Sequence, residues 1–169
     1  FERNTDRDFQ VETNAGTIIG TDEDNHYSFK GIPYAKPPVG DLRWRAPRDL
    51  PRSDEPIYAI EYKSSCVQPG DGSLSLGSSR KIYSGNEDCL YLNVFVPQNQ
   101  TQFDKNNFPV MFWIHGGANI FGAGSQYDFS ALATSQQVII VTMNYRLGVF
   151  GWFTSNHLRD TSEGLDKSS

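Results

Sequence analysis

The sequence predicts an α/β fold in which a small antiparallel sheet precedes the first strands of a central, mostly parallel sheet. Two short apolar segments, residues 110–115 and 138–143, flank a segment with a helical pattern at 128–137. This strand–helix–strand spacing is typical of a parallel sheet. Upstream, residues 11–32 alternate between apolar and polar side chains and are interrupted by turn residues, which favours antiparallel pairing. A length of 169 residues fits one domain.

The N-terminal segment predicts three strands and then an irregular coil. Residues 11–20 form a hairpin pattern, with Asn-Ala-Gly at 14–16 as the turn signal. Residues 27–32 alternate again and predict the third strand. The stretch 33–47 contains four prolines, which exclude a regular helix or a central strand. We therefore expect an ordered, extended coil there.

Three segments predict the strands of the central sheet. Residues 90–96 form a strand that Pro97 ends, because proline lacks the N–H that a ladder needs. Residues 110–115 are nearly all apolar, which is the pattern of a strand covered on both faces. Residues 138–143 predict a third buried strand, and we expect all three to be of the parallel type.

The segment between the last two strands predicts a short helix at 128–137. Asp128 precedes a run of small and apolar residues and is a candidate N-cap. The last strand runs into residues 144–153, which glycines interrupt repeatedly. We expect a loop there.

Composition and charge exclude some classes of partner. The net charge is −5, and the excess of acidic residues lies within residues 1–24, where we expect a solvated segment. No basic stripe is present to neutralise phosphates, so nucleic-acid binding is not expected. No apolar run approaches the roughly 18 residues that span a bilayer. The sequence leaves the oligomeric state open.

The two cysteines, Cys66 and Cys89, have 22 residues between them, and the intervening segment is rich in glycine and serine. A disulfide would close this loop and stabilise the fold by about 3 kcal/mol in the chain-entropy model. It would also imply an oxidising compartment. Two unrelated reduced thiols fit the cysteine count equally well.

A glycine pair, Gly116 and Gly117, follows the apolar strand at 110–115 directly. A strand that ends in such a turn can leave main-chain N–H groups pointing outward, and these can bind the negative oxygen that develops when an ester carbonyl is attacked. A turn that needs glycine only for its positive φ would give the same motif. The motif alone favours neither interpretation.

Five separated motifs together resemble the type-B carboxylesterases, the esterase/lipase and cholinesterase-like branch of the α/β-hydrolase superfamily. The resemblance runs from about residue 11 to about residue 153, in the family's order, and the C-terminal tail is more similar to bacterial members. The five motifs are Gly31-Ile-Pro-Tyr-Ala35, Pro38-Val-Gly-Asp-Leu-Arg43-Trp44, Glu87-Asp-Cys-Leu-Tyr-Leu-Asn93-Val, Trp113-Ile-His-Gly-Gly-Ala118 and Asn144-Tyr-Arg-Leu-Gly148.

The resemblance implies a serine hydrolase that acts on small or medium carboxylic esters through an acyl-enzyme, with no cofactor and no metal. Gly117 and Ala118 match the oxyanion-hole positions, and His115 would orient that loop. The chain contains no Gly-x-Ser-x-Gly, the motif that carries the serine in this superfamily. We therefore interpret residues 1–169 as the N-terminal portion of an incomplete α/β-hydrolase domain, a fragment that is inactive alone.

The resemblance also implies two structural pairs. Arg43 and Glu87 match a family ion pair that ties the proline-rich coil to the base of the cysteine loop. Cys66 and Cys89 match the family disulfide, which favours an exported protein, secreted or periplasmic. Residues 67–88 contain no tryptophan, which argues against a choline ester as substrate.

A non-catalytic, cholinesterase-like binding or adhesion protein is the alternative. Such proteins keep the fold and the disulfide but lose the serine. The intact Gly-Gly-Ala sequence at 116–118 favours the enzyme, because a binding protein does not need oxyanion donors. In either case we expect the isolated chain to be prone to aggregation, since the central strands would leave an apolar edge unpaired.

Overall fold

A computed structural model describes residues 7–70, 83–98, 108–156, 164 and 166. The helical elements are η2 (Gly40–Leu42), η3 (Gly124–Gln126), α2 (Ser130–Gln136) and α3 (Gly148–Trp152). The strands are β1 (Asp8–Thr13), β2 (Gly16–Asp22), β3 (His26–Pro33), β4 (Ile57–Tyr58), β5 (Gln68–Pro69), β6 (Tyr83–Ser84), β7 (Tyr91–Pro97), β8 (Val110–Ile114) and β9 (Ile139–Met143).

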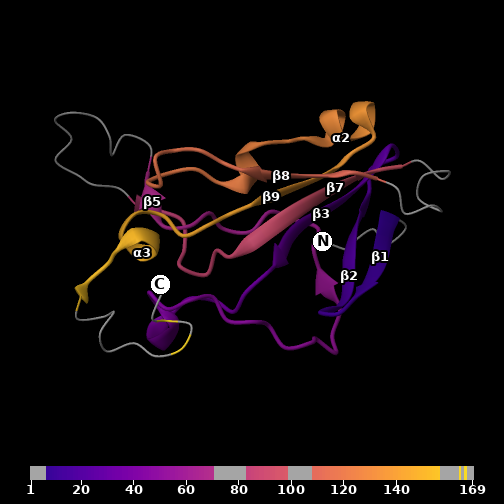
Figure 1. Cartoon of the computed structure of the whole chain (residues 1–169). Helices are drawn as coiled ribbons and strands as arrows, with labels where there is room; N and C mark the ends of the chain where they lie inside the picture. Colours follow the sequence, from indigo (N-terminus) through magenta and orange to yellow (C-terminus); the bar gives the residue numbers. More distant parts are fainter. Residues whose placement is uncertain (1–6, 71–82, 99–107, 157–163, 165, 167–169) are drawn as a thin grey trace.

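Seven of these strands form a single mixed sheet in the order β1-β2-β3-β7-β9-β8, with β4 paired to β2 (Figure 1). The expected hairpin is present, because β1 pairs antiparallel with β2 from Asp8 to Thr13. The antiparallel strands are not a separate sheet, however: β3 pairs along most of its length with β7. Phe29 of β3 and Val96 of β7 belong to one buried cluster, and this shared core joins the two halves.

An irregularity in the β3–β7 pairing is stabilised by a buried asparagine. The register shifts between Lys30 and Ile32, and the intervening Gly31 has a φ of +82°. Its N–H would lack a ladder partner, but it donates to the Asn93 side-chain oxygen at 2.9 Å. The Asn93 amide in turn donates to the Thr142 hydroxyl of β9 at 3.0 Å. A polar network therefore fixes three neighbouring strands at this level.

Two features of the central strands differ from the expectation: the direction of β7 and the solvent exposure of β8. β8 and β9 are parallel, as the strand–helix–strand spacing predicts, but β7 runs antiparallel to β9. Among the described residues β8 is an edge strand rather than one covered on both faces. The exposed fractions of Val110, Phe112 and Ile114 are 64%, 52% and 64%.

The helical elements also depart slightly from the sequence prediction. Helix α2 begins at Ser130, so Phe129 and not Asp128 occupies the N-cap position. The Asp128 side chain still accepts a hydrogen bond from the Ser130 N–H at 2.9 Å. Ala133 of α2 packs on Phe95 and Ile140. The expected loop after β9 contains helix α3. Gly151 allows this turn because a Cβ there would lie 2.2 Å from the Arg146 carbonyl oxygen.

The cysteine loop is described only at its base. β5 and β6 pair antiparallel there, and residues 71–82 lie outside the described part of the chain. Across the described segments, no helix has the length and apolar character needed to cross a membrane.

Candidate active site

The loop that follows β8 is tightly wound. Gly117, Ala118 and Asn119 adopt consecutive positive φ values of 118°, 55° and 58°. The Gly117 carbonyl oxygen accepts hydrogen bonds from the Ile120 N–H at 2.9 Å and the Phe121 N–H at 3.2 Å. A Cβ on Gly117 would lie 1.9 Å from the Phe121 carbonyl oxygen. Only glycine fits position 117 without a backbone shift.

This winding leaves two adjacent donors without an acceptor. Among the described residues, no oxygen accepts a hydrogen bond from the main-chain N–H of Gly117 or of Ala118. Ala118 is exposed and Gly117 is half-buried. Main-chain N–H groups are strong donors that folded proteins rarely leave unpaired away from solvent. These two groups can therefore bind an oxygen atom of a ligand.

His115 lies inside the protein and braces the start of the loop. It is 3% exposed, and its ring stacks on Tyr145 with the centroids 4.3 Å apart. Its Nδ1 lies 2.8 Å from the Gly116 carbonyl oxygen. Because a carbonyl only accepts, Nδ1 carries the proton. Nε2 is buried and has no partner among the described residues.

The other end of the loop is fixed by side chains from distant segments. The Asn144 side chain, at the end of β9, accepts the Gly124 N–H at 2.9 Å and donates to the Ser64 carbonyl at 3.1 Å. The Tyr34 hydroxyl donates to the Asn144 carbonyl at 2.8 Å. Burial raises the pKa of Tyr34 to about 12 although Arg146 opposes it, so this hydroxyl keeps its proton.

An open hollow of about 420 Å³ is lined in part by Ala118, one of the two donor residues. Trp152 and Phe153 line this hollow. The Trp44 indole N–H donates to the carbonyl of Val149, another lining residue, at 3.0 Å. The described lining contains no charged side chain; it consists of Ala118, Asn119, Ile120, Gly148, Val149, Trp152 and Phe153. An uncharged, apolar group fits this surface better than an ion.

Both structural pairs that the resemblance implies are in contact. Arg43 donates two hydrogen bonds to Glu87, from Nε at 2.5 Å and from Nη2 at 2.6 Å. These bonds and the carboxylate charge raise the pKa of Arg43 above its ordinary value. Cys66 and Cys89 form a disulfide. The proline-rich coil and the cysteine loop are therefore held together at the loop base.

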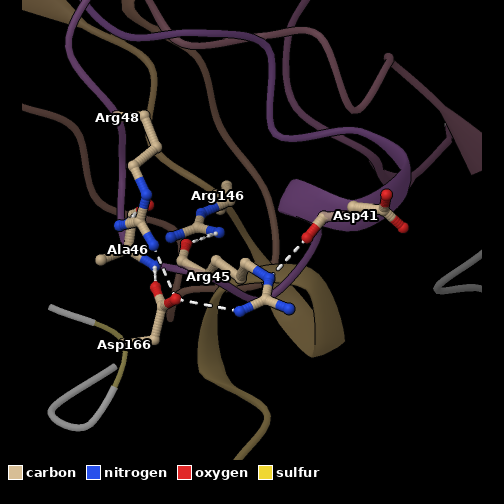
Figure 2. Close-up of polar contacts among 6 residues, drawn as sticks. All are labelled: Asp41, Arg45, Ala46, Arg48, Arg146 and Asp166. Atoms are coloured by element: carbon tan, nitrogen blue, oxygen red, sulfur yellow. Dashed lines mark hydrogen bonds and ion pairs between the residues drawn. The ribbon is translucent and has the colours of Figure 1, made fainter. Parts of the chain in front are cut away.

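Sequence reasoning missed a second ion cluster, in which one carboxylate meets two guanidinium groups (Figure 2). Asp166 accepts hydrogen bonds from Arg48 Nη2 at 2.6 Å, Arg45 Nη1 at 3.1 Å and the Ala46 N–H at 2.9 Å. Arg146 donates to the Arg45 carbonyl at 2.9 Å. No local spacing connects residue 166 with residues 45–48, so only the folded chain could reveal this cluster.

The surroundings of the Asp166 carboxyl group favour its charged form. Burial opposes ionisation, but the Ala46 N–H and the guanidinium groups of Arg48 and Arg45 outweigh burial and lower the pKa of Asp166. The cluster ties residue 166 to the proline-rich coil. Within the described ranges, no three His, Cys, Asp or Glu side chains lie close enough together to hold a metal ion.

Antiparallel strands that lead into a parallel pair, with a glycine loop directly after a parallel strand, match the N-terminal part of the α/β-hydrolase fold. The family model described as the carboxylesterase family matches residues 7–164. The chain belongs to the carboxylesterase family.

Individual relatives support the same assignment. The chain is 47% identical over 155 residues to the para-nitrobenzyl esterase of Bacillus subtilis (strain 168), covering 90% of this chain and 30% of that protein. It is 41% identical over 151 residues to the pyrethroid hydrolase Ces2e of Rattus norvegicus, covering 83% and 26%. The chain thus spans less than a third of the length of these relatives.

Solved structures are similar as well. A thermophilic para-nitrobenzyl esterase superposes with a TM-score of 0.77 at 43% identity, covering 92% of this chain and 32% of that one. EstA of Aspergillus niger gives a TM-score of 0.76 at 28% identity, covering 96% and 30%. The mixed sheet of this chain therefore matches the first part of a known esterase fold.

Proposed function

We propose that residues 1–169 are the N-terminal portion of a serine carboxylesterase, and that the main-chain N–H groups of Gly117 and Ala118 form part of its oxyanion hole. The observation that carries this proposal is the pair of adjacent N–H groups without an acceptor on a loop that His115 and Gly122 brace from both ends. Membership of the carboxylesterase family and the esterases among the relatives support it.

The proposed reaction is acyl transfer through a serine supplied by a segment beyond these residues. A catalytic histidine, which also lies beyond these residues, accepts the serine hydroxyl proton as the serine oxygen bonds to the ester carbonyl carbon, and the electron pair of the C=O bond moves onto the carbonyl oxygen. Gly117 and Ala118 donate to this oxyanion, and a third donor follows the serine. Removal of one such donor typically reduces kcat by about 10²–10³-fold. Collapse expels the alcohol, which takes a proton from the catalytic histidine, and water then releases the acid.

The substrate of this proposal is a small or medium carboxylic ester. The hollow beside Ala118 is lined mostly by apolar side chains, with Asn119 as the one polar side chain in its described lining, which favours an apolar acyl or alcohol group. The stretch 67–88 offers no tryptophan for a quaternary ammonium group. The disulfide supports an exported protein, secreted or periplasmic, because such bonds persist in oxidising compartments.

A fluorophosphonate probe tests the function. The native protein is treated with the probe, and its intact mass is measured before and after. We expect a species much heavier than 19.0 kDa that gains one adduct and hydrolyses p-nitrophenyl esters. A protein that gains no adduct and hydrolyses no ester would contradict the proposal and favour the non-catalytic binding protein.

A further inference from the structure

Gln68 is a buried polar side chain that clamps the far end of the oxyanion loop. It is 9% exposed. Its Oε1 accepts the Gly122 N–H at 2.8 Å, and its Nε2 donates to the Gly122 carbonyl at 3.0 Å. Nε2 also donates to the Cys66 carbonyl at 3.0 Å. One primary amide therefore satisfies both main-chain groups of a single loop residue.

Gly122, the residue that Gln68 holds, lies against the His115 ring next to the oxyanion donors. Gly122 has a φ of +123°, and a Cβ there would lie 2.3 Å from His115 Nδ1. That same Nδ1 donates to the Gly116 carbonyl. Gly122 therefore lies against the ring that holds the Gly116–Gly117 peptide, and this peptide carries the Gly117 N–H. A shift of Gly122 would loosen this support.

Gln68 is itself anchored to rigid structure. Its backbone pairs with Ser84 in the β5–β6 ladder, and Cys66 bridges to Asn86. Gly85 permits this approach, because a Cβ there would lie 2.4 Å from the Cys66 carbonyl oxygen. The disulfide joins Cys66 to Cys89, next to strand β7. The amide is therefore held by the cysteine-loop base.

We propose that Gln68 is a positioning residue that couples the disulfide-bonded loop base to the oxyanion hole by fixing Gly122 against His115. The inference rests on the proposed function of Gly117 and Ala118. Only a glutamine-length amide meets the requirement. A carboxylate would place negative charge against two carbonyl oxygens, and asparagine is one methylene too short to reach Gly122 from the same backbone.

The variants Gln68→Glu and Gln68→Asn test the proposal in the complete gene product, with Gln136→Glu on the exposed face of α2 as the matched control. Activity on p-nitrophenyl acetate is normalised to active sites titrated with fluorophosphonate. We expect kcat to fall about 10–100-fold in both variants, because a displaced donor loses most of its effect. KM should stay within about twofold, and the control should match the unsubstituted protein.

The pH dependence of Gln68→Glu distinguishes a positioning role of residue 68 from a general loss of folding. In Gln68→Glu the introduced carboxyl group can donate to the Gly122 carbonyl once it is protonated, so its kcat relative to the unsubstituted protein should recover as the pH falls. A kcat per titrated site that is unchanged would overturn the proposal. So would a KM that rises as much as kcat falls.

Amide hydrogen exchange distinguishes failure of this inference from failure of the proposed function. We expect the Gly122 amide to exchange faster in Gln68→Asn than in the unsubstituted protein, with no change in Gln136→Glu. Unchanged exchange would overturn the clamp even in an active esterase. Absence of esterase activity and probe adduct in the unsubstituted protein would instead reject the oxyanion role, while exchange would still report on the clamp.

Discussion

Tyr145 holds His115 in two ways at once. Its ring stacks on the imidazole with an interplanar angle of 18°, and its hydroxyl donates to the His115 carbonyl at 2.6 Å. The two residues follow β9 and β8, which are neighbouring parallel strands, so their carboxyl ends are locked together. Sites of open α/β sheets form at this edge, and here the lock lies directly beneath the glycine turn.

The substitution Tyr145→Phe removes the hydroxyl and keeps the stacking. We expect a loss of about 1 kcal/mol in the free energy of unfolding, the usual net contribution of one hydrogen bond. Chemical denaturation of the complete protein measures it. The matched control is Tyr83→Phe, which removes a hydroxyl from an exposed tyrosine and should leave the unfolding midpoint unchanged. An equal loss in both variants would contradict the role of the Tyr145 hydroxyl.

The substitution Gly117→Ala places a Cβ where the Phe121 carbonyl oxygen lies 1.9 Å away. The loop must rewind, and we expect kcat of the complete protein to fall by about a hundredfold or more, as when an oxyanion donor is lost. Gly116→Ala is the comparison, because a Cβ at that position meets nothing within 4 Å. It should cause a much smaller loss. Comparable activity in the two variants would argue that Gly117 does not shape the oxyanion hole.

Reduction of the Cys66–Cys89 disulfide should lower the free energy of unfolding by about 3 kcal/mol, because the bond closes a loop with a sequence separation of 23. Denaturation with and without reductant measures the difference. The double variant Cys66→Ser/Cys89→Ser should show the same loss and no response to reductant. A reductant effect that persists in the double variant would mean that it acts elsewhere.

Asp166 should make the protein less stable in acid. Its pKa is lowered in the folded state by the Ala46 N–H and by Arg48 and Arg45, against the opposing effect of burial. The carboxylate therefore contributes stability above the ordinary aspartate pKa of about 3.9, and this contribution is lost as the pH falls through the folded-state value. Asp166→Asn should be less stable than the unsubstituted protein at pH 7, and this difference should shrink as the pH falls below the ordinary aspartate range. A stability difference independent of pH would contradict the ion cluster.

The exposed β8 edge should make the isolated 169-residue chain self-associate. Val110, Phe112 and Ile114 expose apolar surface on an edge strand of the described sheet, and such edges pair with other chains. Size-exclusion chromatography at increasing concentration should show assemblies. The variant Val110→Lys/Phe112→Lys should shift the chain towards monomer. A soluble monomer at every concentration without these substitutions would refute the prediction.

Local patterns predicted the elements that short-range chemistry controls. The turn at 14–16 produced the β1–β2 hairpin, and the spacing of 110–143 produced the parallel β8–β9 pair. The glycines of residues 144–153 do not distinguish a loop from a helix, because glycine occurs both in loops and where backbones pack closely. For this reason the sequence predicts a loop where helix α3 forms, although Gly151 serves there to pack against the Arg146 carbonyl.

The sequence by itself determined the family, the disulfide pairing implied by that family, and the position of the glycine turn. Only the tertiary structure decided that β7 runs antiparallel to β9, that Asp166 meets Arg45 and Arg48, and that Gln68 clamps Gly122. The physical reason is range. Turn and strand propensities act over a few residues, whereas these contacts join residues 45 to 121 positions apart and exist only once the whole sheet has formed.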